Sequence, residues 1–303
     1  MSEAAGSTYL DRLAARSAAT GTVLCLGLDP VPTALPKGFS EDLAGIERFV
    51  ELVVEAAVPF AAAVKPNLSF YEAYGSAGLA ALERIRARIP ADVPVIADGK
   101  RGDIDVTSAR QSVAYFDALG FDAVTVNPYV GEEALINYLE RPDRFAYVLC
   151  RTSNPGAVDF QALRIATHQR DDGSLAAPSE PLWARVAREV ASWGPGGTVG
   201  LVVGATAPEE LRAIRAIARD LPFLVPGIGA QGGSIEPVLV HGPVAGRLPT
   251  RPGGSLIVNV SRGIASAALE DGDGARGVGV RGDFQERVAS AARDWSERLP
   301  VLP

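Results

Sequence analysis

The sequence is poor in the residues that mark several common protein classes. Only Cys25 and Cys150 are cysteine, and both lie in apolar stretches that read as strands. Such cysteines are typical of small buried side chains, so we expect no disulfide framework and a reducing, cytoplasmic location. The two histidines, His168 and His241, have no cysteine or carboxylate at metal-ligand spacing, and we therefore expect no metal site.

Long apolar runs and basic clusters are also missing. No stretch approaches the roughly 20 apolar residues that a membrane-spanning helix requires. Residues 1–16 carry Glu3 and Asp11 and lack the continuous apolar core of a signal peptide. The formal net charge is −7, without a block of Lys or Arg. We expect neither a membrane nor a nucleic acid as partner.

Lysine is scarce in a chain that otherwise uses arginine. Of 29 basic side chains, only Lys37, Lys65 and Lys100 are lysine. A lysine retained in such a chain is there either by chance or for chemistry, because an ammonium can give up a proton and a guanidinium effectively cannot. Lys65 and Lys100 both fall in motifs that suggest chemistry.

What the sequence does have is a regular alternation of short apolar runs with longer amphipathic stretches. Eight runs predict strands, at residues 22–28, 60–65, 93–97, 122–126, 145–150, 198–203, 222–225 and 255–260. Helical patterns lie between them, at residues 42–57, 77–89, 104–119, 132–139, 180–193 and 208–220. The alternation predicts an α/β fold of parallel strands, and their number favours a (β/α)8 TIM barrel, with an open sheet as the alternative.

The domain organisation follows from the same pattern. No low-complexity linker divides the chain, so we expect residues 1–303 to form a single domain. The connection at 227–253 has little periodicity and predicts at most a short helix. Two segments interrupt the alternation, at about 157–178 after the fifth strand and at 271–282 before the last helix, and we interpret both as loop insertions.

The most informative motif follows the third strand, because barrel enzymes carry their active sites at the carboxyl ends of the strands. It reads Asp98-Gly99-Lys100-Arg101-Gly102-Asp103. In an extended chain Asp98 and Lys100 point the same way, into the barrel mouth, and carboxylates on either side keep the ammonium charged and ready to act as an acid. An ordinary ion pair also explains Asp98 and Lys100. Taken alone, Asp103 is better explained as an N-cap for a helix beginning near Ile104, and the roles of cap and catalyst are compatible.

Other strand ends carry polar or glycine-rich segments. Lys65 ends the second strand, where it either extends to the rim without function or joins the charged motif of the third strand. The turn at 226–233 follows the seventh strand, and Arg262 follows the eighth. Glycines let backbone N–H groups approach an anion, and an arginine binds phosphate through two hydrogen bonds. A glycine-rich turn alone is weak evidence, but with Arg262 it predicts a phosphate site.

Taken together, these motifs resemble the orotidine 5'-phosphate decarboxylases, in particular the larger subgroup often called type 2. The resemblance rests on five loops in the correct order: Asp98 to Asp103 with Ile104 and Thr107, Leu26 to Pro30, Lys65 to Asn67, Thr152 to Gly156, and Pro226 to Gly233. The chain departs from the compact members at Ser261, where they have glycine. The long segment after the fifth strand is a feature of the larger subgroup.

The resemblance implies a cofactor-free decarboxylation of orotidine 5'-phosphate to uridine 5'-phosphate, in pyrimidine biosynthesis. It implies that Lys100 protonates the C6 carbanion and that Asp98 lies near the departing carboxylate. It also implies a homodimer with shared active sites. By similarity, the remaining site residues are Asp29 and Lys65 at the ribose, Ser153 at the pyrimidine, Pro226, Gln231 and Arg262 at the phosphate, and Asp103 and Thr107 in the neighbouring subunit's site.

Two alternative functions stay open on the sequence. A Mg²⁺-dependent sugar-phosphate decarboxylase of the same superfamily shares the Asp-x-Lys-x-x-Asp run but needs a further carboxylate, for which Glu72 is the candidate. A non-catalytic barrel that binds a phosphate ligand would keep the glycine-rich turn and Arg262 without turnover. Metal dependence separates the first alternative from the main hypothesis, and loss of substrate absorbance separates the second.

Overall fold

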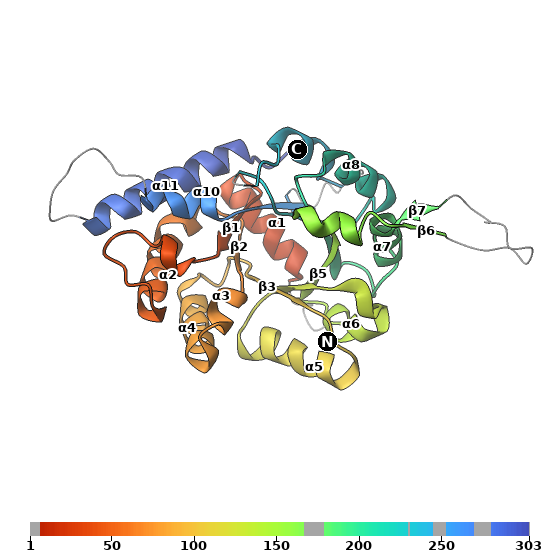
Figure 1. Ribbon diagram of the computed structural model, residues 1–303, viewed down its shortest axis with the longest axis horizontal. Helices are drawn as coiled ribbons and strands as arrows, with labels where there is room; N and C mark the ends of the chain where they lie inside the picture. The colour runs from red at the N-terminus through yellow and green to blue at the C-terminus, as the bar shows by residue number, and fades with distance from the viewer. Residues whose placement is uncertain (1–6, 167–178, 230, 245–252, 270–279, 303) are drawn as a thin grey trace, which may run out of the picture.

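Eight parallel strands form a barrel in the computed structural model, which describes residues 7–166, 179–229, 231–244, 253–269 and 280–302 (Figure 1). The strands match the eight predicted runs: β1 (Leu24–Leu28), β2 (Ala63–Pro66), β3 (Ile96–Arg101), β4 (Ala123–Val126), β5 (Phe145–Arg151), β8 (Val199–Val203), β9 (Phe223–Val225) and β10 (Leu256–Val260). Their order is β2-β1-β10-β9-β8-β5-β4-β3. Parallel bridges between Val64 and Val95 and between Asn67 and Asp98 join the two ends of this order. The predicted α/β TIM barrel is confirmed, and the open sheet is wrong.

Helices surround the barrel, one after most strands (Figure 1). The longer ones are α2 (Leu43–Ala57), α4 (Gly75–Arg88), α5 (Asp105–Ser112), α6 (Glu132–Leu139), α7 (Leu182–Val190), α8 (Pro208–Ile217) and α11 (Val280–Arg298). A π-helical segment, Val113–Ala118, continues α5. The weakly periodic seventh connection holds only the short α9 (Ile235–His241), as predicted, and α3 (Ser69–Glu72) and α10 (Arg262–Ala265) are single turns after β2 and β10.

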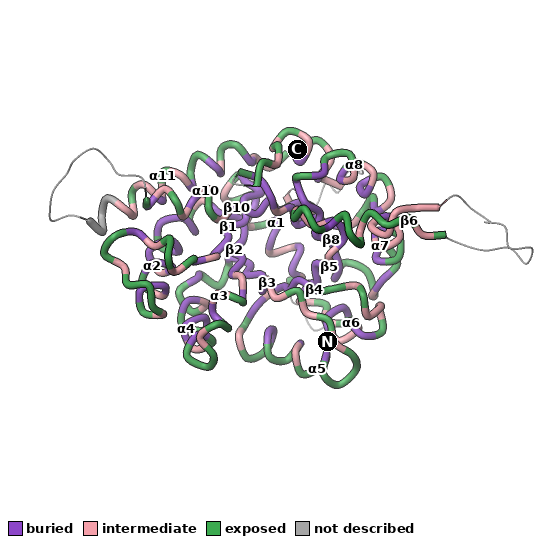
Figure 2. Tube along the Cα trace, viewed as in Figure 1, coloured by how far each residue is buried: buried purple, intermediate pink, exposed green. Residues whose placement is uncertain are grey.

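The interior of the barrel is divided into an apolar part and a polar part. Because side chains alternate along a strand, every second residue faces inward. The apolar cluster inside the barrel includes Cys25, Ala63, Ile96, Ala123, Tyr147, Leu224 and Ile257. Two residues further along, at the carboxyl ends, four of these strands carry polar residues at the inward positions: Lys65, Asp98, Thr125 and Asn259. The strands run through the buried centre of the molecule (Figure 2), so this polar layer is the floor of the barrel mouth.

Helix α1 (Tyr9–Thr20), which was not among the predicted elements, covers the opposite end of the barrel. The ring of Tyr9 stacks on Phe145 with 4.9 Å between centroids, and its hydroxyl lies 3.2 Å from that of Tyr147. Arg16 donates hydrogen bonds to the carbonyls of Val58 and Ala61, just before β2. Since α1 seals the amino-terminal end, the carboxyl end is left for ligands.

The two predicted insertions are only partly described. Residues 167–178 of the first and 271–279 of the second lie outside the described residues. The described part of the first holds a 3-10 turn, Pro155–Asp159, and the strand β6 (Arg164–Ile165), which pairs antiparallel with β7 (Glu180–Pro181). The second was predicted to extend to 282, which is wrong, because α11 begins at Val280.

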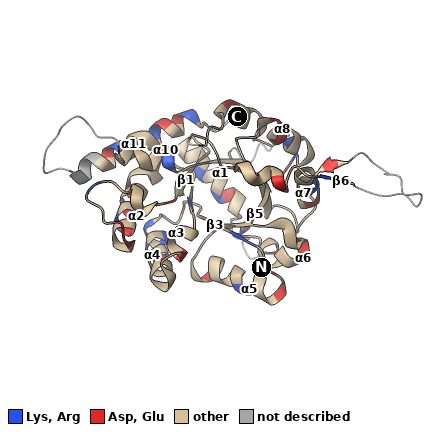
Figure 3. Cartoon of the chain, in the orientation of Figure 1, with Lys and Arg blue, Asp and Glu red and all other residues tan. Residues whose placement is uncertain are grey.

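Charged residues of both signs are spread along the outer helices, whereas the strands are largely uncharged (Figure 3). Within the described ranges, no helix has the length and apolar character needed to cross a membrane.

Candidate active site

Three charged side chains from two neighbouring strands form an ion-pair network at the barrel mouth. Lys65 on β2 is 4% exposed, and its ammonium pairs with Oδ2 of Asp98 on β3. The Lys100 Nζ lies 2.6 Å from Oδ1 of the same carboxylate, and about half of the Lys100 side chain is exposed. One buried carboxylate thus holds two ammonium groups, one beneath the surface and one facing the mouth.

The network fixes the charge state of its buried members. Burial alone would raise the pKa of Asp98, but the ammonium groups of Lys65 and Lys100 lower it well below its ordinary value of 3.8. Burial would likewise lower the pKa of Lys65, yet the carboxylates of Asp98 and Asp29 raise it above its ordinary value of 10.5. Both groups therefore stay ionised at neutral pH.

Lys100 reaches Asp98 by a different backbone path from the one expected. The predicted proximity of the two side chains is found, but the chain between them does not stay extended, because Lys100 has a φ of 48°. The pairing of β3 with β4 also shifts its register between Ala97 and Arg101. A left-handed residue other than glycine is strained and is retained where surrounding contacts hold it, which is common in active sites.

Asp103 and Thr107 lie apart from the network within one chain. Asp103 is half-buried, and its Oδ1 accepts a hydrogen bond from the Ile104 N–H at 2.8 Å. The prediction that Asp103 caps the helix is wrong, since α5 begins at Asp105 with Ile104 as the capping residue. Thr107, in the first turn of α5, is exposed. The network in a single subunit is therefore Lys65–Asp98–Lys100, without a second carboxylate on Lys100 from the described residues.

Asp29 follows β1 at the same end of the barrel. Its Oδ1 is buried and makes no hydrogen bond to any described residue, although Asp29 lies close enough to influence the charge of Lys65. An unpaired buried acceptor is costly to leave without a partner. Asp29 is thus ready to accept a hydrogen bond from a ligand hydroxyl.

Three predicted residues on the other side of the mouth meet around Gly227. A Cβ at Gly227, whose φ is 101°, would lie 2.9 Å from the Ser153 Cβ and 3.1 Å from the Gln231 Oε1. Pro226 directly precedes this glycine, and its carbonyl accepts a hydrogen bond from the Ala205 N–H at 2.9 Å. The loops after β5, β8 and β9 are therefore packed into one wall, and only glycine permits that approach.

Arg262 begins α10, directly after Ser261 at the end of β10. Its side chain is exposed, and the Ser261 Cβ lies 2.7 Å from where a Cβ of Gly27 would stand. The departure from glycine at position 261 is thus accommodated by a glycine on the neighbouring strand β1. An exposed guanidinium at this strand end is available to an anion at the mouth.

Two polar residues of the inner layer were missed by the sequence reasoning. Thr125 on β4 is 2% exposed and Asn259 on β10 is 9% exposed, with no hydrogen bond to Oδ1 of Asn259 among the described residues. The signal was present, since each interrupts an otherwise apolar strand (Ala-Val-Thr-Val and Leu-Ile-Val-Asn-Val).

The further carboxylate that the magnesium alternative requires, Glu72, already has a partner within the chain. Glu72 forms an ion pair with Arg101, whose Nε also donates to the Tyr115 hydroxyl. Across the part of the chain that the structure describes, no group of three or more His, Cys, Asp or Glu side chains is arranged to hold a metal ion.

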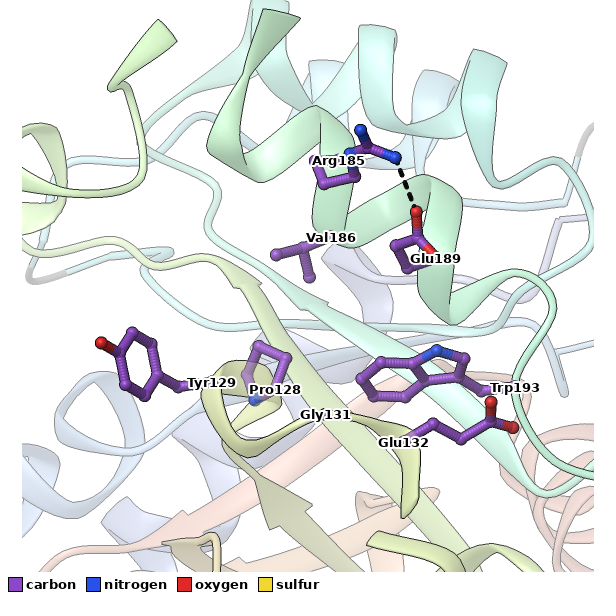
Figure 4. A pocket seen from close by; sticks show the side chains of 8 residues that line it. All are labelled: Pro128, Tyr129, Gly131, Glu132, Arg185, Val186, Glu189 and Trp193. Carbon is purple, nitrogen blue, oxygen red and sulfur yellow. Dashed lines mark hydrogen bonds and ion pairs between the residues drawn. The ribbon is translucent and has the colours of Figure 1, made fainter. Parts of the chain in front are cut away.

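A separate cavity of about 440 Å³ lies between the turn at 128–132 and α7 (Figure 4). Its lining residues are Pro128, Tyr129, Gly131, Glu132, Arg185, Val186, Glu189 and Trp193. In the close-up, Arg185 and Glu189 pair with one another on α7, and the Trp193 ring covers one side. None of the predicted site residues lines it, so it is distinct from the polar barrel mouth.

Known proteins that match most of this chain carry the name of one enzyme family. A family model described as orotidine 5'-phosphate decarboxylase / HUMPS family matches residues 22–276. A protein named orotidine 5'-phosphate decarboxylase from Herpetosiphon aurantiacus is 42% identical over 261 residues, which is 86% of this chain and 90% of that one. One of the same name from Thermomicrobium roseum is 42% identical over 285 residues, or 93% and 96%. The solved structure of Leishmania donovani OMP decarboxylase has a TM-score of 0.76 and 34% identity, with 96% of each chain covered.

Proposed function

This chain belongs to the orotidine 5'-phosphate decarboxylase / HUMPS family, and we propose that its Lys65–Asp98–Lys100 network is the catalytic centre. The reaction is the decarboxylation of orotidine 5'-phosphate to uridine 5'-phosphate in pyrimidine biosynthesis. The observation that carries the proposal is the ammonium of Lys100, held 2.6 Å from Asp98 and exposed at the barrel mouth.

The chemistry explains why an ammonium belongs there. When the bond between C6 and the carboxylate breaks, CO2 leaves and the electron pair stays on C6 as a vinyl carbanion without an adjacent electron sink. A fixed ammonium beside C6 stabilises charge that exists only along the reaction path, which is the way an enzyme raises its turnover. Lys100 then transfers a proton to C6 and is reprotonated from solvent. No further group is needed to balance the reaction.

Asp98 has the role of aiming Lys100. Since its pKa is lowered by two ammonium groups, it stays ionised and holds the Lys100 Nζ through a charge-assisted hydrogen bond. Lys65 lies beneath and is almost fully buried. Its positive charge balances the negative charge of Asp98, so the positive charge of Lys100 is not cancelled by that carboxylate. The network thereby leaves one positive charge at the surface of the mouth.

The remaining residues would bind the substrate. Asp29, with its unpaired buried oxygen, and Lys65 suit the ribose hydroxyls. Ser153 suits the polar edge of the pyrimidine, while Pro226, Gln231 and Arg262 suit the phosphate. In this assignment the phosphate binds at the wall around Gly227, away from the reacting carbon. The binding energy of the phosphate can then position the pyrimidine ring at Lys100.

We further propose a homodimer in which Asp103 and Thr107 complete the partner's site. Ile104 and Val106 lie beside them and are 58% and 69% exposed, so two aliphatic side chains are exposed within three residues. Because apolar exposure next to charged site residues is typical of an interface, a second copy is the occupant that fits. A single domain over residues 1–303 and a cytoplasmic location, in keeping with two free buried cysteines, belong to the same proposal.

The test is a spectroscopic assay of the purified protein with orotidine 5'-phosphate, with and without a chelator. We expect the substrate's absorbance to fall at a rate that the chelator does not change. No change in absorbance with orotidine 5'-phosphate, together with Mg²⁺-dependent turnover of a keto-sugar phosphate, would favour the sugar-phosphate alternative. Tight binding of the nucleotide without any change in absorbance would favour the non-catalytic barrel.

A further inference from the structure

Thr125 is the residue of the polar layer that makes direct contact with two members of the network. Its side chain enters the barrel from β4 and is 2% exposed. The hydroxyl oxygen accepts a hydrogen bond from the backbone N–H of Lys100 at 2.9 Å. It also donates to Oδ1 of Asp98 at 3.1 Å, the same oxygen that binds the Lys100 ammonium. One buried hydroxyl therefore ties the backbone of Lys100 to the carboxylate that holds its side chain.

The contact with the backbone compensates for an irregularity in the sheet. The ladder between β3 and β4 is regular at Ala97 and resumes at Arg101, so the N–H of Lys100 has no place in it. Even a partly buried N–H is costly to leave without a partner, and so is the left-handed conformation of Lys100 at φ 48°. The Thr125 hydroxyl supplies the missing acceptor, which stabilises the strained conformation where it is needed.

The contact with the carboxylate fixes its orientation. Asp98 carries Lys65 on one oxygen, while Lys100 and Thr125 share the other. Without the hydroxyl, Oδ1 would be held by Lys100 alone, whose side chain is half exposed and carries its charge on a long four-carbon stem. A carboxylate held from below by Thr125 offers the ammonium a fixed partner instead of one that moves with it.

We propose that Thr125 is a positioning residue for decarboxylation, which sets where the ammonium of Lys100 stands. The proposal rests on the proposed function of the network. Displacement of a catalytic group by about 1 Å can cost about 100-fold in rate. Because the Thr125 hydroxyl bonds to Lys100 and Asp98 and not to the wall around Gly227, its loss affects kcat much more than KM.

The experiment compares Thr125→Val, which keeps the shape and removes the hydroxyl, with Thr125→Ser, which keeps the hydroxyl. We expect kcat to fall about 10- to 100-fold in the valine variant with KM within about threefold. The serine variant should recover kcat to within about threefold of the unaltered enzyme. Should the valine variant fail to fold, Thr125→Ala takes its place, since alanine and serine differ at this position only by the hydroxyl.

Two outcomes would overturn the proposal. One is a valine or alanine variant that keeps the full kcat, and the other is a serine variant as slow as the one that lacks the hydroxyl. Either result, obtained beside an active unaltered enzyme, leaves the proposed function intact. The proposed function fails separately, if the unaltered enzyme does not decarboxylate the nucleotide or if Lys100→Ala is fully active.

Discussion

At the scale of single residues, function depends on how one carboxylate is shared. Asp98 is mostly buried, and its negative charge is tolerated because Lys65 and Lys100 approach from two sides and Thr125 donates a hydrogen bond. Lys100 is the exposed member, so the site ends in a positive charge directed to the mouth. The same arrangement that makes Asp98 stable makes Lys100 an oriented acid.

The shared carboxylate predicts a specific dependence of stability on acid. The pKa of Asp98 is lowered in the folded protein, so its contribution is fully present above the ordinary value of 3.8 and is lost as the pH falls through the lowered value. Asp98→Asn should therefore be much less stable than the unaltered protein at pH 7, with a difference that shrinks below about pH 4. Urea unfolding at pH 7, 5, 4 and 3 measures this. A difference that stays constant through this range would show that the carboxylate is not held by the lysines.

At the scale of elements, α1 has a structural role that complements the site. It brings Tyr9 against Phe145 and Tyr147 and so fills the amino-terminal end of the barrel. The polar layer at the other end then lies on the packed apolar cluster inside the barrel. This apolar cluster keeps water from reaching the charged network from the amino-terminal end of the barrel, where water would weaken each ion pair.

Truncation of Tyr9 tests this role. We expect Tyr9→Ala to lower the free energy of unfolding by about 3–5 kcal/mol, as for other large buried aromatic side chains. Val240→Ala on α9, where the side chain is 65% exposed, is the matched control and should change it by less than about 0.5 kcal/mol. Denaturant unfolding of both variants gives the comparison. Equal, small effects would mean that α1 is dispensable to the barrel.

Much of the fold could be predicted from the sequence, because strand and helix periodicity is local information. The eight strands and the short α9 follow from it. The left-handed backbone of Lys100 could not be predicted, since it depends on Thr125, which lies on the next strand. Helix α1 could not be predicted either, because its apolar face packs on Phe145 and Tyr147, which lie far away in the sequence. Contacts between distant segments decide these features, and the sequence pattern does not contain them.

At the scale of the whole molecule, the proposed dimer accounts for two observations together. Asp103 and Thr107 resemble site residues but stand outside the network of their own chain, and the adjacent Ile104 and Val106 are exposed. A second subunit packed on this face would cover the aliphatic side chains and receive the polar ones. Activity should then depend on association.

A charge placed on this face tests the dimer. Val106→Glu should raise the dissociation constant at least about 100-fold, because a carboxylate would be buried at the interface without a partner. Its specific activity should fall on dilution, in step with the dimer fraction from sedimentation velocity. Val240→Glu, on an equally exposed valine of α9, should behave as the unaltered enzyme. A fully active monomer would refute the shared site.

The central claim, that Lys100 is the acid at C6, is tested most directly by removing each of two exposed lysines in turn. Lys100→Ala and Lys37→Ala each remove one lysine charge from the surface, but only the first removes the group held by Asp98. Turnover of orotidine 5'-phosphate should fall at least about 10³-fold in Lys100→Ala and stay within about twofold in Lys37→Ala, with both variants folded by circular dichroism. Unchanged turnover in a folded Lys100→Ala would contradict the account.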